Sequence, residues 1–97
     1  MKKTKAESIL HLNLHREYFG QIANGTKRIE YRERTPYWKT RLEGREYSVI
    51  QFRNGYATDA PVMRVEFRGI QKIQKWGKPH YAIQLGRVIS VKRWKGD

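Results

Sequence analysis

The chain has 97 residues, which is enough for one compact domain and too few for two. It contains no cysteine, and this excludes disulfide bonds, thiolate chemistry and cysteine-ligated zinc. The 21 Lys and Arg against 9 Asp and Glu give a formal net charge of +12, and a charge this large indicates a polyanionic partner. A basic surface without any partner has the same composition, so charge alone leaves both readings open.

No apolar stretch approaches the roughly 20 residues that a bilayer-spanning helix needs. The basic residues 1–5 are not followed by the apolar segment of a signal peptide. We therefore expect a cytoplasmic protein that has no membrane partner.

The first half of the chain predicts a strand, a helix, a strand and a second helix. In residues 9–15 three leucines alternate with His and Asn, the period of a half-buried strand. Residues 16–24 carry apolar side chains at helical spacing and end at Asn24-Gly25, two residue types that favour a helix end. Residues 27–34 alternate again, with Ile29 and Tyr31 expected to face the core.

The second helix begins at Thr35-Pro36, because a capping hydroxyl before proline is a strong helix start. It is expected over residues 36–42 and places Trp38 and Leu42 on one side. Both side chains are predicted to pack in the core.

The second half predicts strands only. A strand over residues 47–52 leads into a turn at 53–55, and a further strand alternates from Met63 with a bulge at Gly69. After a loop at 75–79, a last strand runs from Tyr81 to Val91 and bends at Gly86. We predict a mixed α+β, mainly β fold in one domain over residues 1–97, with its core at about 9–91. Five to six short strands and two short helices favour a small β-barrel, whose closure removes exposed sheet edges.

Residues 25–32 read G-T-K-R-I-E-Y-R, which matches the pattern G-x-K-x-x-E-x-R, and residues 81–87 read Y-A-I-Q-L-G-R near the end of the chain. With the preceding helix, these segments resemble the ASCH domain, a family of the PUA-like superfamily, over roughly residues 9–91. The resemblance implies a PUA-like barrel with a cleft between the barrel and the first helix, where the motif residues gather. It also implies RNA binding.

Some members of the family resemble enzymes. One group is similar to metal-independent ribonucleases that cut single strands, and here Lys27 and Glu30 would be the catalytic residues. Another group resembles N4-acetylcytidine amidohydrolases, in which a threonine stands at the position of Glu30 and a further catalytic glutamate lies in an inserted helical region. This chain departs from that group at both points, so the ribonuclease is the stronger of the two enzyme alternatives.

The residues themselves allow two readings of Lys27, Glu30 and Arg32. A lysine beside a carboxylate in an enclosed cleft holds phosphate or takes part in proton transfer. The same three side chains on a solvated strand form ordinary ion pairs, which contribute little. The family resemblance favours the first reading.

Cations interleaved with aromatic rings are typical of proteins that bind single-stranded RNA, because cations neutralise phosphates and rings stack on bases. Tyr37 and Tyr56 are the stacking candidates, since neither belongs to an apolar period. The cationic candidates are Lys27, Arg28, Arg32, Arg34, Lys39, Arg41 and Arg53.

The side chain of Asn54 is a candidate to form hydrogen bonds with the edge of a base, although a plain hairpin turn explains an asparagine at this position equally well. His15 is a candidate because it lies next to the helix and the cleft. His11 shares its strand face, but the two are about 13 Å apart along a strand, too far to act on one phosphodiester. No Asp, Glu or His pattern indicates a metal site, and no glycine-rich loop indicates a nucleotide cofactor.

Three functions remain in order of support. The first is an RNA-binding module for single-stranded or structured RNA, and the second is a metal-independent ribonuclease or nucleoside-processing enzyme of the same architecture. The third is a domain that meets an acidic protein. DNA binding is weaker, because no predicted helix is long and basic enough to enter a major groove. The oligomeric state is not indicated.

Overall fold

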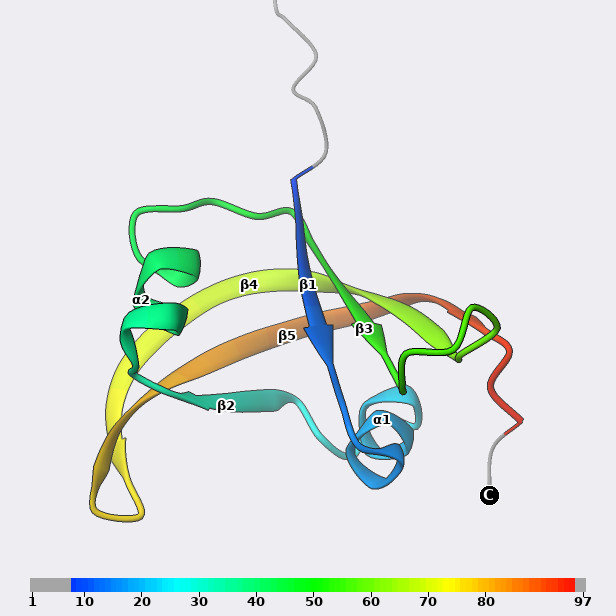
Figure 1. Cartoon of the computed structure of the whole chain (residues 1–97), viewed down its shortest axis with the longest axis horizontal. Coiled ribbons are helices and arrows are strands. Elements are labelled where there is room, and N and C mark those ends of the chain that lie inside the picture. The colour runs from blue at the N-terminus through cyan, green and yellow to red at the C-terminus, as the bar shows by residue number, and fades with distance from the viewer. Residues whose placement is uncertain (1–7, 96–97) are drawn as a thin grey trace, which may run out of the picture.

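The computed structural model describes residues 8–95, and Figure 1 shows their arrangement. Five strands and two helices alternate early in the chain and give way to strands later. Their order is β1 (Ile9–Asn13), α1 (Arg16–Ala23), β2 (Ile29–Glu33), α2 (Pro36–Leu42), β3 (Val49–Arg53), β4 (Val62–Lys75) and β5 (Lys78–Lys92). The predicted fold class, mixed α+β and mainly β with two short helices, is confirmed.

The strands form one five-stranded sheet in the order β1-β3-β4-β5-β2. β1 runs parallel to β3, and the other neighbouring pairs are antiparallel. The sheet curls strongly, so that β1 and β2 face each other across an opening (Figure 1).

The prediction of a closed barrel is not confirmed. β1 and β2 are the two edges of the sheet and are not paired with each other. Polar side chains occupy the opening instead, and one of them crosses it: the Arg32 guanidinium on β2 donates to the backbone carbonyl of Asn13 on β1, at 3.1 Å. The fold is thus an open, curled sheet whose two edge strands, β1 and β2, are connected by the side chain of Arg32.

The long β4–β5 hairpin gives the sheet its bend. Its turn is Trp76-Gly77, both with positive φ (55° and 74°), which is the geometry of a tight two-residue hairpin turn. The loop predicted over residues 75–79 is therefore shorter, since Lys75 already pairs with Lys78. The predicted bulge at Gly69 is confirmed by its φ of 110° and by a shift in register between Phe67 and Ile70.

The core lies inside the curl and is closed on one side by α1. Phe19 of α1 is fully buried with strand residues such as Phe52 and Ile83. The C-terminal Trp94 packs on Phe19, at 4.9 Å between ring centroids, and so covers the same end of the core. As predicted, α2 begins at Pro36, with the hydroxyl of Thr35 accepting from the backbone of Trp38.

Candidate functional site

Glu30 points to the core side of the sheet. On the neighbouring strand β5, Glu30 lies opposite Ile83, and Arg32 lies opposite Tyr81. Residues directly opposite each other share a face of the sheet, so both polar side chains stand on the face that holds the buried Ile83 and Tyr81. Glu30 is only 7% exposed, which excludes an ordinary solvated ion pair.

The prediction that Tyr31 faces the core is wrong for the same reason. Tyr31 lies opposite Ala82 and points away from the Glu30 face. Its ring lies 4.3 Å from the ammonium of Lys75 and 5.9 Å from the ring of Trp76. Tyr31 therefore lies on the outer face of β2, and the charged Glu30 and Arg32 lie on the inner face. Trp38, in contrast, packs against the core as predicted.

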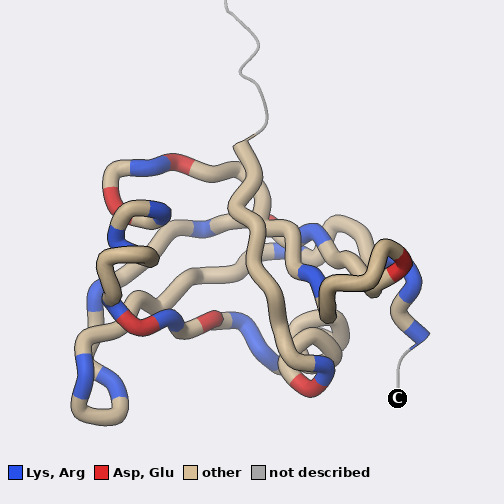
Figure 2. The backbone as a smooth tube through the Cα atoms, in the orientation of Figure 1, with Lys and Arg blue, Asp and Glu red and all other residues tan. Residues whose placement is uncertain are grey.

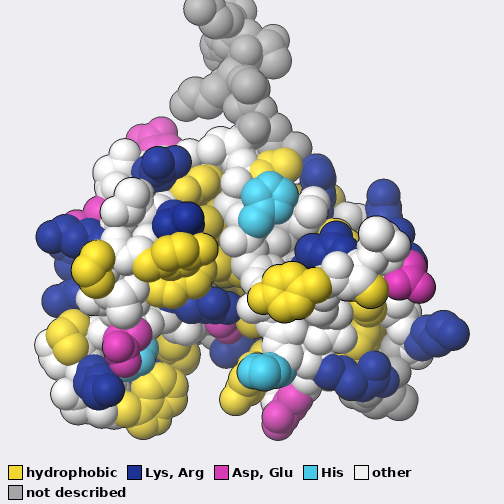
Figure 3. All heavy atoms as spheres, in the orientation of Figure 1, with side chains coloured by type: hydrophobic (Ala, Val, Ile, Leu, Met, Phe, Trp, Pro, Cys, Tyr) yellow, Lys and Arg dark blue, Asp and Glu magenta, His cyan; other side chains and the backbone are white. Residues whose placement is uncertain are grey.

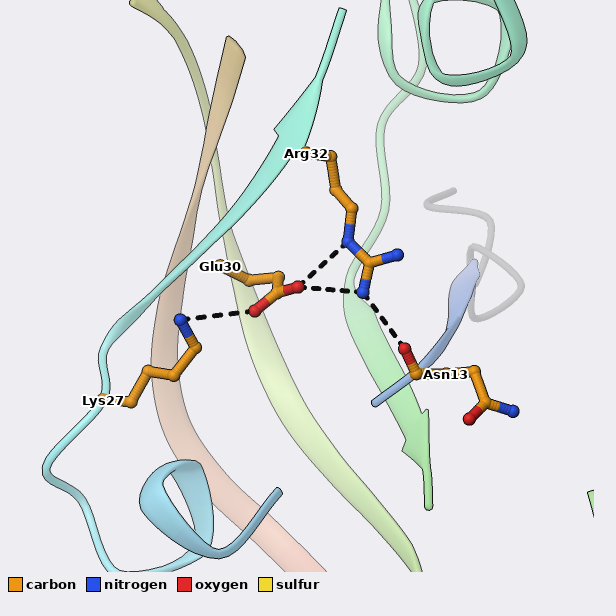
Figure 4. Close-up of polar contacts among 4 residues, drawn as sticks. All are labelled: Asn13, Lys27, Glu30 and Arg32. Atoms are coloured by element: carbon orange, nitrogen blue, oxygen red, sulfur yellow. Dashed lines mark hydrogen bonds and ion pairs between the residues drawn. The ribbon is translucent and has the colours of Figure 1, made fainter. Parts of the chain in front are cut away.

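Three charged side chains of the motif meet in one cluster (Figure 4). Arg32 holds one oxygen of Glu30 from both its Nε, at 2.9 Å, and a terminal nitrogen, at 2.8 Å. The Lys27 ammonium lies 3.4 Å from the other carboxylate oxygen. Through Arg32 the cluster also reaches Asn13 on the far side of the opening. A nearly buried carboxylate is therefore compensated by two half-buried cations, and all three side chains hold one another in place.

Lys27 reaches this cluster because the chain turns sharply after α1. The backbone of Lys27 donates to Gln21 in the helix at 3.0 Å, and Thr26 is held by the side chain of Asn24. This turn points Lys27 to the same side as Glu30, which simple strand alternation does not predict. The ammonium also lies 5.3 Å from the ring centre of Tyr18, close enough for a cation–π contact.

Two hollows adjoin the cluster. The first, called here the α1 hollow, has a volume of about 350 Å³ and contains both Lys27 and Glu30. Its remaining lining is mostly aromatic: Tyr18, Tyr31, Lys75 and Trp76. The two residues predicted to be catalytic therefore face one cavity together.

The second, called here the α2 hollow, has a volume of about 370 Å³ and contains Arg32. It lies between α2 and the loop after β3, with lining residues His11, Leu12, Asn13, Tyr37, Trp38, Gln51, Arg53 and Tyr56. Arg32 of this hollow is bonded to Glu30 of the α1 hollow, so an ion pair links the two hollows, and together we call them the groove. Figure 3 shows hydrophobic side chains on both sides of the hollowed face, with basic side chains between them.

A third hollow touches the end of the groove and shares Asn13 and Tyr56 with it. It contains His15 and Asn54. The amide of Asn54 donates to the backbone carbonyl of Leu14 at 2.9 Å, and so ties the loop to β1. Asn54 thus positions the loop that carries Tyr56, besides lying beside the groove.

Arg53 has a comparable position. Its guanidinium donates to the carbonyls of Gly55 and Ala57, two residues of the loop after β3. It therefore lines the α2 hollow while it supports that loop from within.

Four of the predicted RNA-binding cations do not line the groove: Arg28, Arg34, Lys39 and Arg41. Arg41 stacks on the ring of Tyr37 at 3.5 Å, and Arg34 lies 5.9 Å from the ring centre of Tyr81. Figure 2 shows basic residues along most of the chain. The excess charge is therefore spread over the surface, and what distinguishes the groove is the combination of cations with exposed rings.

Sequence reasoning missed Tyr18, Lys75 and Trp76. Tyr18 was counted with the apolar face of its helix, yet it is 43% exposed and turns toward Lys27. Trp76 is 72% exposed at the tip of the hairpin. Its ring contacts Tyr31 and His80, two contacts that no local pattern of the sequence indicates.

A tyrosine–glutamate hydrogen bond anchors α2, which carries Tyr37 and Trp38 into the groove. The hydroxyl of Tyr81 donates to Glu43, at the end of α2, at 2.5 Å. Burial of the phenol, together with this bond, raises the pKa of Tyr81 to about 12. The bond from Tyr81, with the nearby Lys72, lowers the pKa of the Glu43 carboxyl.

These shifts predict an alkaline loss of stability. Because the folded pKa of Tyr81 is raised above its ordinary value of 10.0, its contribution is complete below pH 10 and is lost as the pH rises toward 12. Thermal unfolding of the wild type and of Tyr81→Phe measures this contribution. The difference in melting temperature between the two is expected to shrink across that window, and a constant difference would contradict the assignment.

Within residues 8–95, no three His, Asp or Glu side chains gather as ligands for a metal ion. In the same part of the chain, neither helix has the length and apolar character needed to cross a membrane.

Comparison with known proteins agrees with the geometry of the motif. The family model of the ASCH domain matches residues 12–95, nearly the whole chain. Neither the curated proteins nor the solved structures that were compared give a match. The match includes the Lys27–Glu30–Arg32 cluster and every lining residue of the groove except His11. This chain belongs to the ASCH domain family.

Proposed function

We propose that this protein binds single-stranded RNA along the groove, with bases in the two hollows and phosphates over the adjoining cations. The observation that carries the proposal is the placement of the exposed rings. Among the described residues, the exposed aromatic side chains are Tyr18, Tyr37, Tyr56 and Trp76, and all four line the groove. Large apolar side chains that gather at one concave place on a surface mark a binding site.

Charge supports an anionic ligand at the same place. The lining of the two hollows contains four cations, Lys27, Arg32, Arg53 and Lys75, and one carboxylate, Glu30. Stacking of a base on an aromatic ring is worth about 1–3 kcal/mol, and each neutralised phosphate adds a salt-dependent contribution. Membership of the ASCH family, for which RNA binding is expected, supports RNA as the polyanion.

The size of the hollows favours unpaired bases. Each measures about 350–370 Å³, at the lower end of the range of small-ligand pockets and suited to one base. A base that is paired in a duplex keeps its stacking faces and its edge engaged, so it cannot enter. Single strands are therefore the preferred form.

A salt series tests the proposal. The logarithm of the association constant for a short, fluorescently labelled oligouridylate is expected to fall linearly with the logarithm of salt concentration, with a slope of about −0.7 per neutralised phosphate. An affinity that does not change with salt concentration would contradict RNA binding through phosphates. Lys27→Ala is expected to weaken binding more than Lys95→Ala, whose exposed side chain lies outside the groove. Equal losses would mean that bulk charge, and not the groove, holds the strand.

A second candidate function is RNA cleavage by Lys27 and Glu30, and one observation favours it. The carboxylate oxygen of Glu30 that faces Lys27 is not bonded to Arg32, so it is the oxygen available to take a proton from a 2′-hydroxyl. In this role Lys27 would stabilise the charge that develops on the phosphate. Incubation of labelled RNA with the protein and a chelator tests this. Cleavage that disappears in Glu30→Gln under conditions where the variant is folded and saturated with RNA would support the enzyme, and cleavage that survives the substitution would come from another source.

A further inference from the structure

The free edge of β1 turns toward the groove. Within residues 8–95, β1 is the last strand on its side of the sheet and pairs only with β3. The backbone of Leu14 donates to Arg53 of β3, at 2.8 Å. Because the N–H and C=O groups of a strand point to opposite sides in alternate residues, those of His11 and Asn13 turn away from β3. The carbonyl of Asn13 confirms this direction, since it accepts from Arg32 across the opening.

The α2 hollow lies along this edge. It touches three consecutive residues of β1, namely His11, Leu12 and Asn13. The lining also includes Gln51 and Arg53 of β3, which lie opposite His11 and Asn13 and share their face. The hollow therefore covers this face and reaches the open edge of β1, where Arg32 contacts the carbonyl of Asn13. Its walls include Trp38 from α2 and Tyr56 from the loop after β3. An unpaired strand edge thus lies between aromatic rings.

On the basis of the proposed function, we propose that the α2 hollow holds one unpaired nucleobase and reads its Watson–Crick edge with the backbone of β1. The N–H of His11 donates to an acceptor of the base, and the carbonyl of His11 accepts from the neighbouring N–H of the base. Every nucleobase has an acceptor next to a donor on this edge, whereas a paired base has both engaged. Tyr56, whose side chain is 90% exposed, supplies a face on which the base stacks.

The same edge is poorly suited to an added peptide strand. Strand addition needs a continuous row of free backbone groups, but Arg32 already occupies the carbonyl of Asn13. A single base needs only one donor and one acceptor, which His11 provides. The excess of cations over carboxylates in the lining also favours a nucleotide over a neutral peptide.

Two changes test the inference from its two sides. On the RNA, 3-methyluridine in place of uridine removes the ring N–H and puts a methyl group on the Watson–Crick edge. On the protein, His11→Pro removes the N–H that faces the hollow. The ladder with β3 keeps its hydrogen bonds, because proline is tolerated on an edge strand where its nitrogen faces outward. The matched variant His11→Ala removes the side chain and keeps the N–H.

The measurement is the ratio of affinities for an oligouridylate and for the same oligomer of 3-methyluridine, obtained by fluorescence anisotropy. Wild type and His11→Ala are expected to discriminate against the methylated strand by about three- to tenfold, the effect of one lost hydrogen bond. In His11→Pro the ratio is expected to fall toward one.

Equal affinities of the wild type for both strands would overturn the inference, and so would equal ratios in His11→Pro and His11→Ala. If His11→Pro does not fold, as judged by circular dichroism, the ratios of wild type and His11→Ala still test the inference, because a ratio of one in the wild type would overturn it. Failure of the wild type to bind either strand would overturn the proposed function itself, which is a different result from binding without discrimination.

Discussion

Glu30→Gln is expected to weaken RNA binding although it adds one positive unit to a net charge of +12. The reason is that Glu30 holds Arg32 and Lys27 at the meeting point of the two hollows. Without the carboxylate, two half-buried cations repel each other and leave these positions. We expect affinity for an oligouridylate to fall about tenfold, equivalent to about 1.4 kcal/mol.

The same substitution is expected to destabilise the fold. Breaking a fully buried ion pair by removing one partner costs about 3–5 kcal/mol. Lys27 and Arg32 keep about a fifth of their side-chain surface exposed, so we expect a smaller loss of about 2–4 kcal/mol. Urea denaturation gives this free energy of unfolding, and binding is compared at low denaturant, where both proteins are folded.

The matched control is Glu33→Gln on the same strand. Glu33 lies on the opposite face of β2 and makes one exposed contact, 3.8 Å from Lys78. This change alters net charge by the same amount, and its effect on stability is expected to stay within about 0.5 kcal/mol. Tighter binding by both variants would show that bulk charge governs affinity, and would contradict a structural role for the cluster.

Trp76→Ala and Tyr56→Ala are each expected to reduce affinity for an oligouridylate by about 5- to 150-fold. Loss of one base–ring stack costs about 1–3 kcal/mol. The two side chains are 72% and 90% exposed and line different hollows. Their effects should therefore add in the double variant, as expected of independent sites. The slope of the salt dependence should stay unchanged, because no cation is removed.

Ile89→Ala is the control for these ring substitutions. Ile89 is 47% exposed on β5 and lies outside the lining of the groove. Its truncation removes exposed apolar surface of comparable kind, and affinity is expected to stay the same. An equal loss in Ile89→Ala and Trp76→Ala, measured by anisotropy titration, would mean that the rings have no particular role.

Most elements of the fold were predictable because their signals are local. The leucine alternation of β1, the Thr35-Pro36 start of α2 and the bulge at Gly69 each depend on a few neighbouring residues. Closure of the sheet was not predictable, because it depends on whether β1 and β2 approach each other. In the structure the two strands stay apart, and Arg32 of β2 reaches across the opening to the carbonyl of Asn13 on β1.

The orientation of β2 shows why the alternation of apolar residues can predict the wrong core face for a strand that carries a polar site. Ile29 and Tyr31 are the more apolar residues, so alternation predicts that they face the core. The inner face instead takes Glu30 and Arg32, because Lys27 arrives from the turn after α1 and compensates the buried carboxylate together with Arg32. Only the family motif indicated that these residues gather in a cleft.

The aromatic lining depends on contacts between distant parts of the chain. Trp76 meets Tyr31 because the hairpin register places β5 beside β2. Tyr18 fits the apolar period of its helix and Trp76 belongs to no period, so the sequence alone gives no means of assigning the two rings to a common surface. Tyr37 and Tyr56 were identified because their turn and loop positions already excluded them from the core.

Amide chemical-shift mapping during titration with an oligouridylate tests most directly that RNA lies in the groove. We expect the largest changes in β1, in residues 27–32, in the loop around Tyr56 and at Trp76, with Ile89 and Val91 unaffected. Changes spread evenly over the basic residues, or centred on the outer surface of β5, would contradict this account.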